Sequence, residues 1–133
     1  MSDPADEVIR SVLSMISGKW KVPIIRVLST KGDTQFNQLV RELDGISARI
    51  LTIQLKELSE DGLVIRMEFG KEMNRNPPEV LYALSYKGAS LIPILAAMGK
   101  WGTEHNQEKC DRISFDGPGM DGYPIWKNIS DIK

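Results

Sequence analysis

Apolar residues recur at helical spacing in the first part of the chain, and this pattern predicts two successive helices. The first runs from about residue 6 to residue 16 and has a wide apolar face, made of Val8, Ile9, Val12, Leu13 and Ile16. Ser17-Gly18 ends it. The second runs from about residue 20 to residue 28, with an apolar side made of Trp20, Ile24, Val27 and Leu28. Lys31-Gly32-Asp33 ends this second helix.

A short third helix is expected after that stop. Thr34 is placed to cap its first turn, and its apolar positions are Phe36, Leu39, Val40 and Leu43. Gly45 then supplies a turn into the next helix. The predicted order is therefore helix, turn, helix.

The helix after Gly45 has two different faces. Ser47 can cap it, and Gly62 can adopt the left-handed conformation that ends it. At 100° per residue, one face carries Leu51, Leu55 and Leu58, and the opposite face carries Arg49, Ile53, Lys56 and Glu60, with Thr52 at its flank. A solvated face would normally lack an isoleucine. A helix in a DNA major groove uses Arg for guanine and apolar groups for thymine methyls, so this helix is predicted to read DNA.

Two β-rich segments follow Gly62, from residue 63 to 69 and from residue 80 to 85. The polar segment between them, residues 70–78, contains Pro77-Pro78 and has the composition of an exposed hairpin tip. The pattern predicts a two-stranded wing. The fold class is therefore α+β, mainly α.

A last helix is predicted from Lys87, with Pro93 bending it near its start. Together with the first helix it carries more apolar surface than one small core can bury, and a two-fold dimer is the commonest way to cover such an excess. We therefore expect a homodimer with N- and C-terminal dimerisation helices. The expected interface residues are Val8, Val12, Leu91, Leu95, Met98 and Trp101.

The helical pattern stops at about residue 107. Residues 1–108 are expected to form the DNA-binding and dimerisation domain, and residues 109–133 a C-terminal extension rich in Gly, Pro and aromatic residues. These aromatics argue against pure disorder, so the extension is expected to pack as an arm on the body or on the partner subunit.

Charge is distributed unevenly along the 133 residues. The net charge is -1, but residues 18–56 hold seven Lys or Arg against three Asp or Glu, a local net of +4. This supplies a positive field for phosphates without the overall basicity of a non-specific DNA coater. The single cysteine, Cys110, excludes an intrachain disulfide and a cysteine-rich zinc site, and no apolar run approaches a membrane span. We expect a cytosolic protein.

The residues do not suggest catalysis or a cofactor. No glycine-rich phosphate loop precedes a helix, and no combination of nucleophile, base and orienting group has a recognisable spacing. His105, with Glu104, Glu108 and Cys110 nearby, does not fix a metal geometry and is predicted to be a surface residue. No enzyme activity and no metal or cofactor are expected.

Three helices followed by a two-stranded wing form the winged helix-turn-helix arrangement, and the residues resemble one subgroup, the HxlR-type (MarR-like) transcriptional regulators. The resemblance covers about residues 8 to 102. It is carried by Ile16-Ser17-Gly18-Lys19-Trp20, Gln35-Phe36-Asn37-Gln38-Leu39, Gly45-Ile46-Ser47, Asp61-Gly62-Leu63-Val64 with Arg66, Pro77-Pro78, Gly88 and Trp101.

The resemblance implies a dimeric DNA-binding regulator of transcription, with the third helix of the motif in the major groove and the wing at the neighbouring minor groove. Two departures stand out. Glu79 and Leu81 replace the basic and acidic residues usual in the family's second wing strand. Redox-sensing members carry a cysteine in or just before the first helix, whereas residues 1–20 contain none.

The candidate DNA contacts lie mainly on the helix that starts after Ser47. Arg49 is predicted to bond guanine O6 and N7, and Thr52 and Ile53 to read bases beside it. Ser47 is predicted to cap the helix or touch phosphate, and Lys56 to contact a phosphate. Arg75 at the hairpin tip is a minor-groove candidate opposed by Glu72 and Glu79. Generic backbone-contact candidates are Lys19, Lys21, Lys31 and Gln38.

Three alternatives stay open at this point. The winged fold could serve as a protein interaction module without sequence-specific DNA binding, as Glu60, Glu79 and the acidic remainder suggest. Cys110 could sense oxidants directly. Apolar space between Trp20 and Trp101 could house a small aromatic effector as an additional partner.

Overall fold

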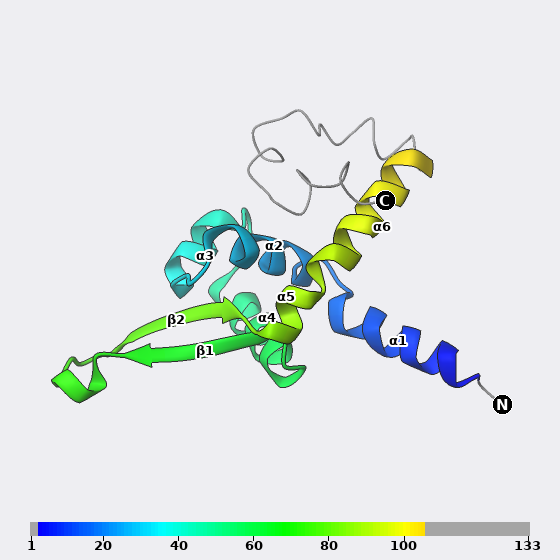
Figure 1. Cartoon of the computed structure of the whole chain (residues 1–133). Helices are drawn as coiled ribbons and strands as arrows, with labels where there is room; N and C mark the ends of the chain where they lie inside the picture. The colour runs from blue at the N-terminus through cyan, green and yellow to red at the C-terminus, as the bar shows by residue number, and fades with distance from the viewer. Residues whose placement is uncertain (1–2, 106–133) are drawn as a thin grey trace.

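The computed structural model describes residues 3–105 of the chain (Figure 1). Its elements are α1 (Pro4–Ile16), α2 (Lys21–Lys31), α3 (Phe36–Glu42), α4 (Ala48–Glu60), β1 (Val64–Phe69), a 3-10 turn η1 (Lys71–Met73), β2 (Glu79–Leu84), α5 (Tyr86–Ser90) and α6 (Ile92–His105). The predicted arrangement of helices followed by a two-stranded wing is confirmed. Cys110 and the extension at residues 109–133 lie outside the described residues.

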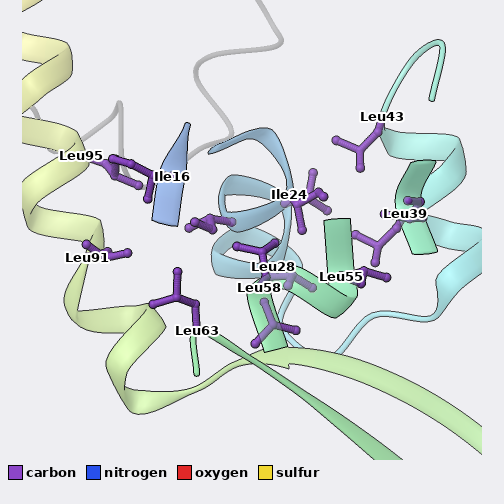
Figure 2. Close-up of a cluster of buried hydrophobic side chains, with 14 of the residues drawn as sticks. Ile16, Ile24, Leu28, Leu39, Leu43, Leu55, Leu58, Leu63, Leu91 and Leu95 are labelled. Carbon is purple, nitrogen blue, oxygen red and sulfur yellow. The ribbon is translucent and has the colours of Figure 1, made fainter. Parts of the chain in front are cut away.

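One core holds the helices together (Figure 2). It contains Ile24 and Leu28 of α2, Leu39 of α3, and Leu55 and Leu58 of α4. Figure 2 shows Leu91, Leu95 and Ile16 joining this cluster from the α5–α6 side and from α1. The core therefore fixes the helix-turn-helix unit and anchors only the end of α1, whose other residues extend away from the body in Figure 1.

Helix α4 forms as its sequence predicts. The Ser47 hydroxyl accepts a hydrogen bond from the Ile50 N–H at 3.1 Å, and Gly62 ends the helix with φ of 77°. Leu51, Leu55 and Leu58 are 0%, 3% and 0% exposed, which places one face of α4 entirely in the core. Each such leucine contributes about 1.5–3 kcal/mol by burial, so this face is held firmly.

Thr34 does not cap α3, contrary to the sequence prediction. Its hydroxyl donates to the Gly32 carbonyl, and the N-cap position is Gln35, whose side chain makes no capping bond. Thr34 instead pairs with Tyr82 of β2 through Thr34 N to Tyr82 O (2.9 Å) and Tyr82 N to Thr34 O (2.8 Å). The turn before α3 is therefore used as a backbone partner for the wing, a long-range pairing that local sequence does not reveal.

The wing is an antiparallel hairpin of β1 and β2 with Val64 opposite Leu84 and Phe69 opposite Glu79. It projects away from the helical body, on the side opposite to α1 (Figure 1). Val64 and Leu84 lie at the body, since Val64 is buried in the core and Leu84 packs against it. Directly opposed residues of an antiparallel pair share one face, so Arg66 and Tyr82 come next on that face.

The predicted single helix from Lys87 is two helices, α5 and α6, separated at Leu91. Pro93 lacks an N–H and cannot donate to the Ala89 carbonyl four residues earlier, while the Leu91 N–H bonds the Gly88 carbonyl three residues earlier. Helix bonding resumes with Leu95 N to Leu91 O at 2.9 Å. The expected bend is thus a complete break. Helix α2 also runs three residues beyond its predicted end, to Lys31.

The end of α4 is held by the start of α5. Ser85 donates through its backbone N–H to the Leu63 carbonyl at 3.0 Å and through its hydroxyl to the Gly62 carbonyl, and Lys87 donates to the Asp61 carbonyl at 2.7 Å. Gly88 approaches this junction so closely that a Cβ atom there would lie 2.1 Å from the Leu63 carbonyl oxygen. Position 88 therefore requires glycine for close packing.

Replacing Gly88 by alanine should destabilise the protein strongly. The obstructing atom belongs to the backbone, so the strand or α5 must shift, at an expected loss of about 3 kcal/mol or more. Gly102→Ala is the matched control, because nothing lies within 4 Å of a Cβ atom at that helical glycine and the change should stay within about 1 kcal/mol of neutral. Urea unfolding measures both; equal stability of the two variants would contradict the close packing.

Candidate nucleic-acid interface

The predicted reading face of α4 is exposed. Arg49, Thr52 and Lys56 are exposed, and Ile53, at 39%, is an apolar side chain displayed on the same surface. Because Leu51, Leu55 and Leu58 hold the opposite face in the core, these side chains cannot rotate inward with the helix. The structure therefore brings together Arg49, Thr52, Ile53 and Lys56, with Ser47 at the helix start.

The side chains of this face differ in which of their groups remain available to bind a ligand. The Thr52 hydroxyl donates to the Ala48 carbonyl at 2.8 Å, which leaves its methyl group and its acceptor lone pairs for a ligand. Lys56 lies 4.0 Å from Glu60, a weak exposed pair. Within residues 3–105, no acidic side chain pairs with Arg49. Arg49 is thus available for a bidentate contact.

Two of the predicted backbone-contact candidates form ion pairs within the protein. Lys21 is only 8% exposed and its ammonium lies 2.9 Å from Glu57, which ties α2 to α4. Lys31 lies 3.6 Å from Glu42 and ties the end of α2 to the end of α3. Lys21 and Lys31, two of the seven cations counted in residues 18–56, therefore have an acidic partner in the fold.

The other two backbone-contact candidates lie away from α4. Lys19 is exposed just before α2, and its ammonium lies 4.9 Å from the ring centroid of Trp20, a cation–π arrangement. Gln38 is half-buried in α3. Neither side chain belongs to the reading face itself.

At the wing tip, Arg75 pairs with Glu79. The guanidinium lies 3.1 Å from the Glu79 carboxylate. Glu79 is one of the residues that depart from the family pattern. Its carboxylate, which was predicted to oppose phosphate, forms a direct ion pair with Arg75. A minor-groove contact by Arg75 would have to compete with it.

A hollow of about 320 Å³ lies where α4 meets the wing, and sequence reasoning did not predict it. Its lining residues come from the helix and from both strands: Thr52, Leu55, Lys56, Ser59, Arg66 and Tyr82. Arg66 and Tyr82 were missing from the site prediction because their closeness to α4 depends on the strand register. The spacing of Thr52, Lys56 and Ser59 on one stripe of α4 was the signal available in the sequence.

Arg66 stays positively charged in this hollow. Its guanidinium donates to the Glu68 carboxylate at 2.7 Å, and this bond, followed by one to the Tyr82 hydroxyl, raises the pKa of Arg66 above its ordinary value. The same Arg66 bond, followed by the charge of Lys71, lowers the pKa of Glu68. Both groups are therefore ionised at neutral pH.

A broad apolar surface lies on α1 and α6. Its most exposed members are Val8 (64%), Trp101 (65%), Ile9, Leu13, Ile94 and Met98. Val12 is half-buried, while Leu91 and Leu95 are buried within the protomer, which assigns those two leucines to the core and not to an outer surface. Of the predicted interface residues, Val8, Met98 and Trp101 are thus the ones displayed for a partner.

Neither Trp20 nor Trp101 lines the apolar cavity beside α1. That cavity, of about 400 Å³, lies between α1, α2 and α6 and is lined by Leu13, Ile16, Ser17, Val22, Leu95, Met98 and Gly99. Trp101 stacks on His105 with ring centroids 4.9 Å apart. His105 also contacts the Trp101 carbonyl at 2.9 Å, so it is engaged with its own helix.

Two features are absent from the part of the chain that the structure describes. No cluster of three or more His, Cys, Asp or Glu side chains there could hold a metal ion. None of the helices in residues 3–105 combines the length and the apolar character needed to cross a membrane.

Residues 15–110 match the family model described as HxlR-like helix-turn-helix. The chain belongs to this HxlR-like family. Its relatives include a Fusobacterium mortiferum protein assigned as the regulatory protein MalR, 44% identical over 97 residues that cover 73% of this chain and 88% of MalR. The uncharacterized HTH-type transcriptional regulator BH0655 of Halalkalibacterium halodurans is 42% identical over 93 residues, covering 70% of this chain and 79% of that one.

A solved structure agrees with these HxlR-like relatives. A transcriptional regulator assigned to the MarR family, from Enterococcus faecalis V583, superposes with a TM-score of 0.69 at 37% identity, covering 84% of this chain and 96% of that one. The HxlR-like chain is therefore a transcriptional regulator with a winged helix-turn-helix DNA-binding fold, and the family implies double-stranded DNA as its partner.

The Ser47 cap gives a test of how α4 of this HxlR-like protein is held. Ser47→Ala removes the acceptor for the Ile50 N–H and should lower the free energy of unfolding by about 1 kcal/mol, whereas Ser47→Gly should cost only about a few tenths. Chemical denaturation compares the two. Unchanged stability of Ser47→Ala would show that the hydroxyl does not stabilise the helix.

Proposed function

We propose that this chain acts as a homodimer that binds a palindromic operator in a sequence-specific manner. The observation that carries the proposal is the reading face of α4, where Arg49, Thr52 and Ile53 are exposed while the opposite face is locked in the core. A rigid helix with this chemistry fits the major groove, whose edges present guanine acceptors and thymine methyls.

The residues of the α4 reading face suit different groups of the DNA because their chemistry differs. Arg49, near the start of α4, is placed to bond guanine O6 and N7, at about 1–3 kcal/mol of discrimination. Ile53 and the Thr52 methyl suit thymine methyl groups, since the Thr52 hydroxyl hydrogen is engaged within the helix. Lys56 suits a phosphate. The wing lies at the neighbouring minor groove, with a smaller contribution from Arg75 because Glu79 holds it.

The apolar surface of α1 and α6 supports the dimer. Exposed side chains such as Val8, Leu13, Met98 and Trp101 come from two elements at the ends of residues 1–108, the segment we propose as the DNA-binding and dimerisation unit. A second copy covering this surface would present two α4 helices to one duplex face. Half-sites are then expected about 34–36 Å apart, or a multiple of that.

Arg49→Ala and Lys56→Ala should weaken DNA binding in different ways. Loss of Arg49 should relax the preference at one base position, while loss of Lys56 should weaken all sequences alike and lower the salt slope by about 1. Duplexes selected from a random pool and titrated by fluorescence anisotropy provide the measurement. Arg10→Ala, an exposed arginine change on α1, is the matched control and should leave base preference unchanged.

The protein interaction alternative makes the opposite prediction in the same titration. If duplex affinity is weak at low salt and does not fall as salt is added, phosphate contacts are absent and DNA binding is not the function. If Arg49→Ala leaves the base preference of a salt-sensitive complex intact, the assignment of α4 as the reading helix fails.

Met98→Glu should break the dimer. It places a charge on the apolar α6 surface, where Met98 is 47% exposed, and an unpaired charge is costly to bury in an interface. Met73→Glu is the matched control, because Met73 is 81% exposed at the wing tip. Sedimentation equilibrium should show a monomer for the first variant and a dimer for the second. A dimeric Met98→Glu variant would move the interface elsewhere.

A further inference from the structure

The hollow between α4 and the wing concentrates groups that bind anions. Lys56 and Ser59 approach from the helix, and Arg66 and Tyr82 approach from β1 and β2. Leu55, only 3% exposed, forms an apolar floor beneath them. Ammonium and guanidinium groups make charge-assisted hydrogen bonds to a phosphate, and these are stronger than hydrogen bonds between neutral groups.

The position of Tyr82 is fixed from both sides. Its backbone N–H and C=O both bond Thr34, so neither points toward β1, and Tyr82 and Arg66 form a non-hydrogen-bonded antiparallel pair. Side chains lie closest in such pairs. The backbone therefore holds the guanidinium and the phenol hydroxyl next to each other in the hollow.

The hollow is continuous with the reading face. Thr52, Lys56 and Ser59 follow one another along one stripe of α4, and Arg49 precedes them by one turn. When a helix lies in the major groove, the sugar-phosphate backbone runs along its flank. A phosphate at that flank, on the side of the wing, would meet this stripe and Arg66 together.

Two carboxylates border the hollow. Glu68 accepts from Arg66 at 2.7 Å, and Glu60 lies 4.0 Å from Lys56. Arg66 remains half exposed, at 50% of its side chain, so the outer part of its fork is open to a ligand. A guanidinium has five N–H donors, which lets it keep Glu68 and bond a second acceptor.

We propose that this hollow binds one backbone phosphodiester of the operator in each half-site, with Arg66 and Lys56 contacting the phosphate and Tyr82 positioning Arg66. The proposal rests on the proposed function, because it presumes that α4 lies in the major groove. The contact would set the depth and register of α4, so that Arg49 meets its base at the correct height. The wing residues nearest α4 would therefore contribute affinity for DNA and not preference for particular bases.

The first experiment compares duplex binding by the full chain carrying Arg66→Ala, Arg66→Lys or Tyr82→Phe, using a duplex selected by the wild-type protein. Arg66→Ala should weaken binding about tenfold or more per half-site and lower the salt slope by about 0.9 per subunit, with base preference unchanged. Arg66→Lys should recover part of the affinity. Tyr82→Phe keeps the ring and therefore the fold, and should give a smaller loss of the same kind.

The second experiment locates the phosphate. Duplexes with single neutral methylphosphonate linkages should reveal one position per half-site where neutralisation weakens the wild-type protein and has no effect on Arg66→Ala. Arg10→Ala, the control outside the hollow, should retain the wild-type pattern. A wild-type pattern in Arg66→Ala would overturn the proposal, while an altered base preference in Arg49→Ala would still support the proposed function.

Glu68→Gln tests whether the negative charge of Glu68 opposes DNA binding. Removing this negative charge should strengthen binding to all duplexes several-fold, whereas a purely structural role of the Arg66–Glu68 pair predicts weaker binding.

The hollow could bind free phosphate instead of DNA. In that case the duplex affinity of the wild-type protein would fall when phosphate replaces chloride at constant ionic strength, and no single methylphosphonate position would weaken binding. That outcome would overturn the assignment to the DNA backbone.

Discussion

The pairing of Thr34 with Tyr82 is the constraint on which the functional half of the molecule depends. Two backbone hydrogen bonds, of 2.9 and 2.8 Å, join the turn before α3 to the middle of β2. A hairpin that projects from a small body has few contacts to fix its direction, and two strands alone are only marginally stable. Because Tyr82 is held by Thr34 on one edge and lies opposite Arg66 on the other, the base of the wing is fixed against the helix-turn-helix unit.

The second constraint lies at the other end of α4. Gly62 turns the chain, and the carbonyls of Asp61, Gly62 and Leu63 accept bonds from residues at the start of α5. Helix α4, the proposed recognition helix, is therefore fastened at its start by Ser47, along one side by three leucines, and at its end by this junction. A helix fastened in this way presents its outer face at a constant angle, which direct base reading needs because its hydrogen bonds tolerate little displacement.

The distribution of charge explains how a chain with net charge -1 can carry a DNA-binding surface. The fold uses some cations internally, since Lys21 pairs with Glu57 and Lys31 with Glu42, and holds Arg75 against Glu79. Arg49 has no such partner within residues 3–105, and Arg66 is shared between Glu68 and an open hollow. On the proposed DNA-binding surface, Arg49 of α4 and Arg66 at the base of the wing therefore supply positive charge, and a local field of this kind favours a specific complex over general attraction.

The sequence by itself determined α1 to α4, the two wing strands and the faces of α4, because helical periodicity, the Ser47 cap and the Gly62 stop act within a few residues of chain. It also sufficed for the family, through landmarks spread in order from α1 to α6. The tertiary structure decided the features that depend on residues far apart in the chain. Thr34 pairs with the wing instead of capping α3, and Lys21 forms an ion pair with Glu57. Leu91 and Leu95 belong to the core, and Arg66 and Tyr82 face α4. Strand register and ion pairing join residues far apart in the chain, and a local pattern contains no information about such partners.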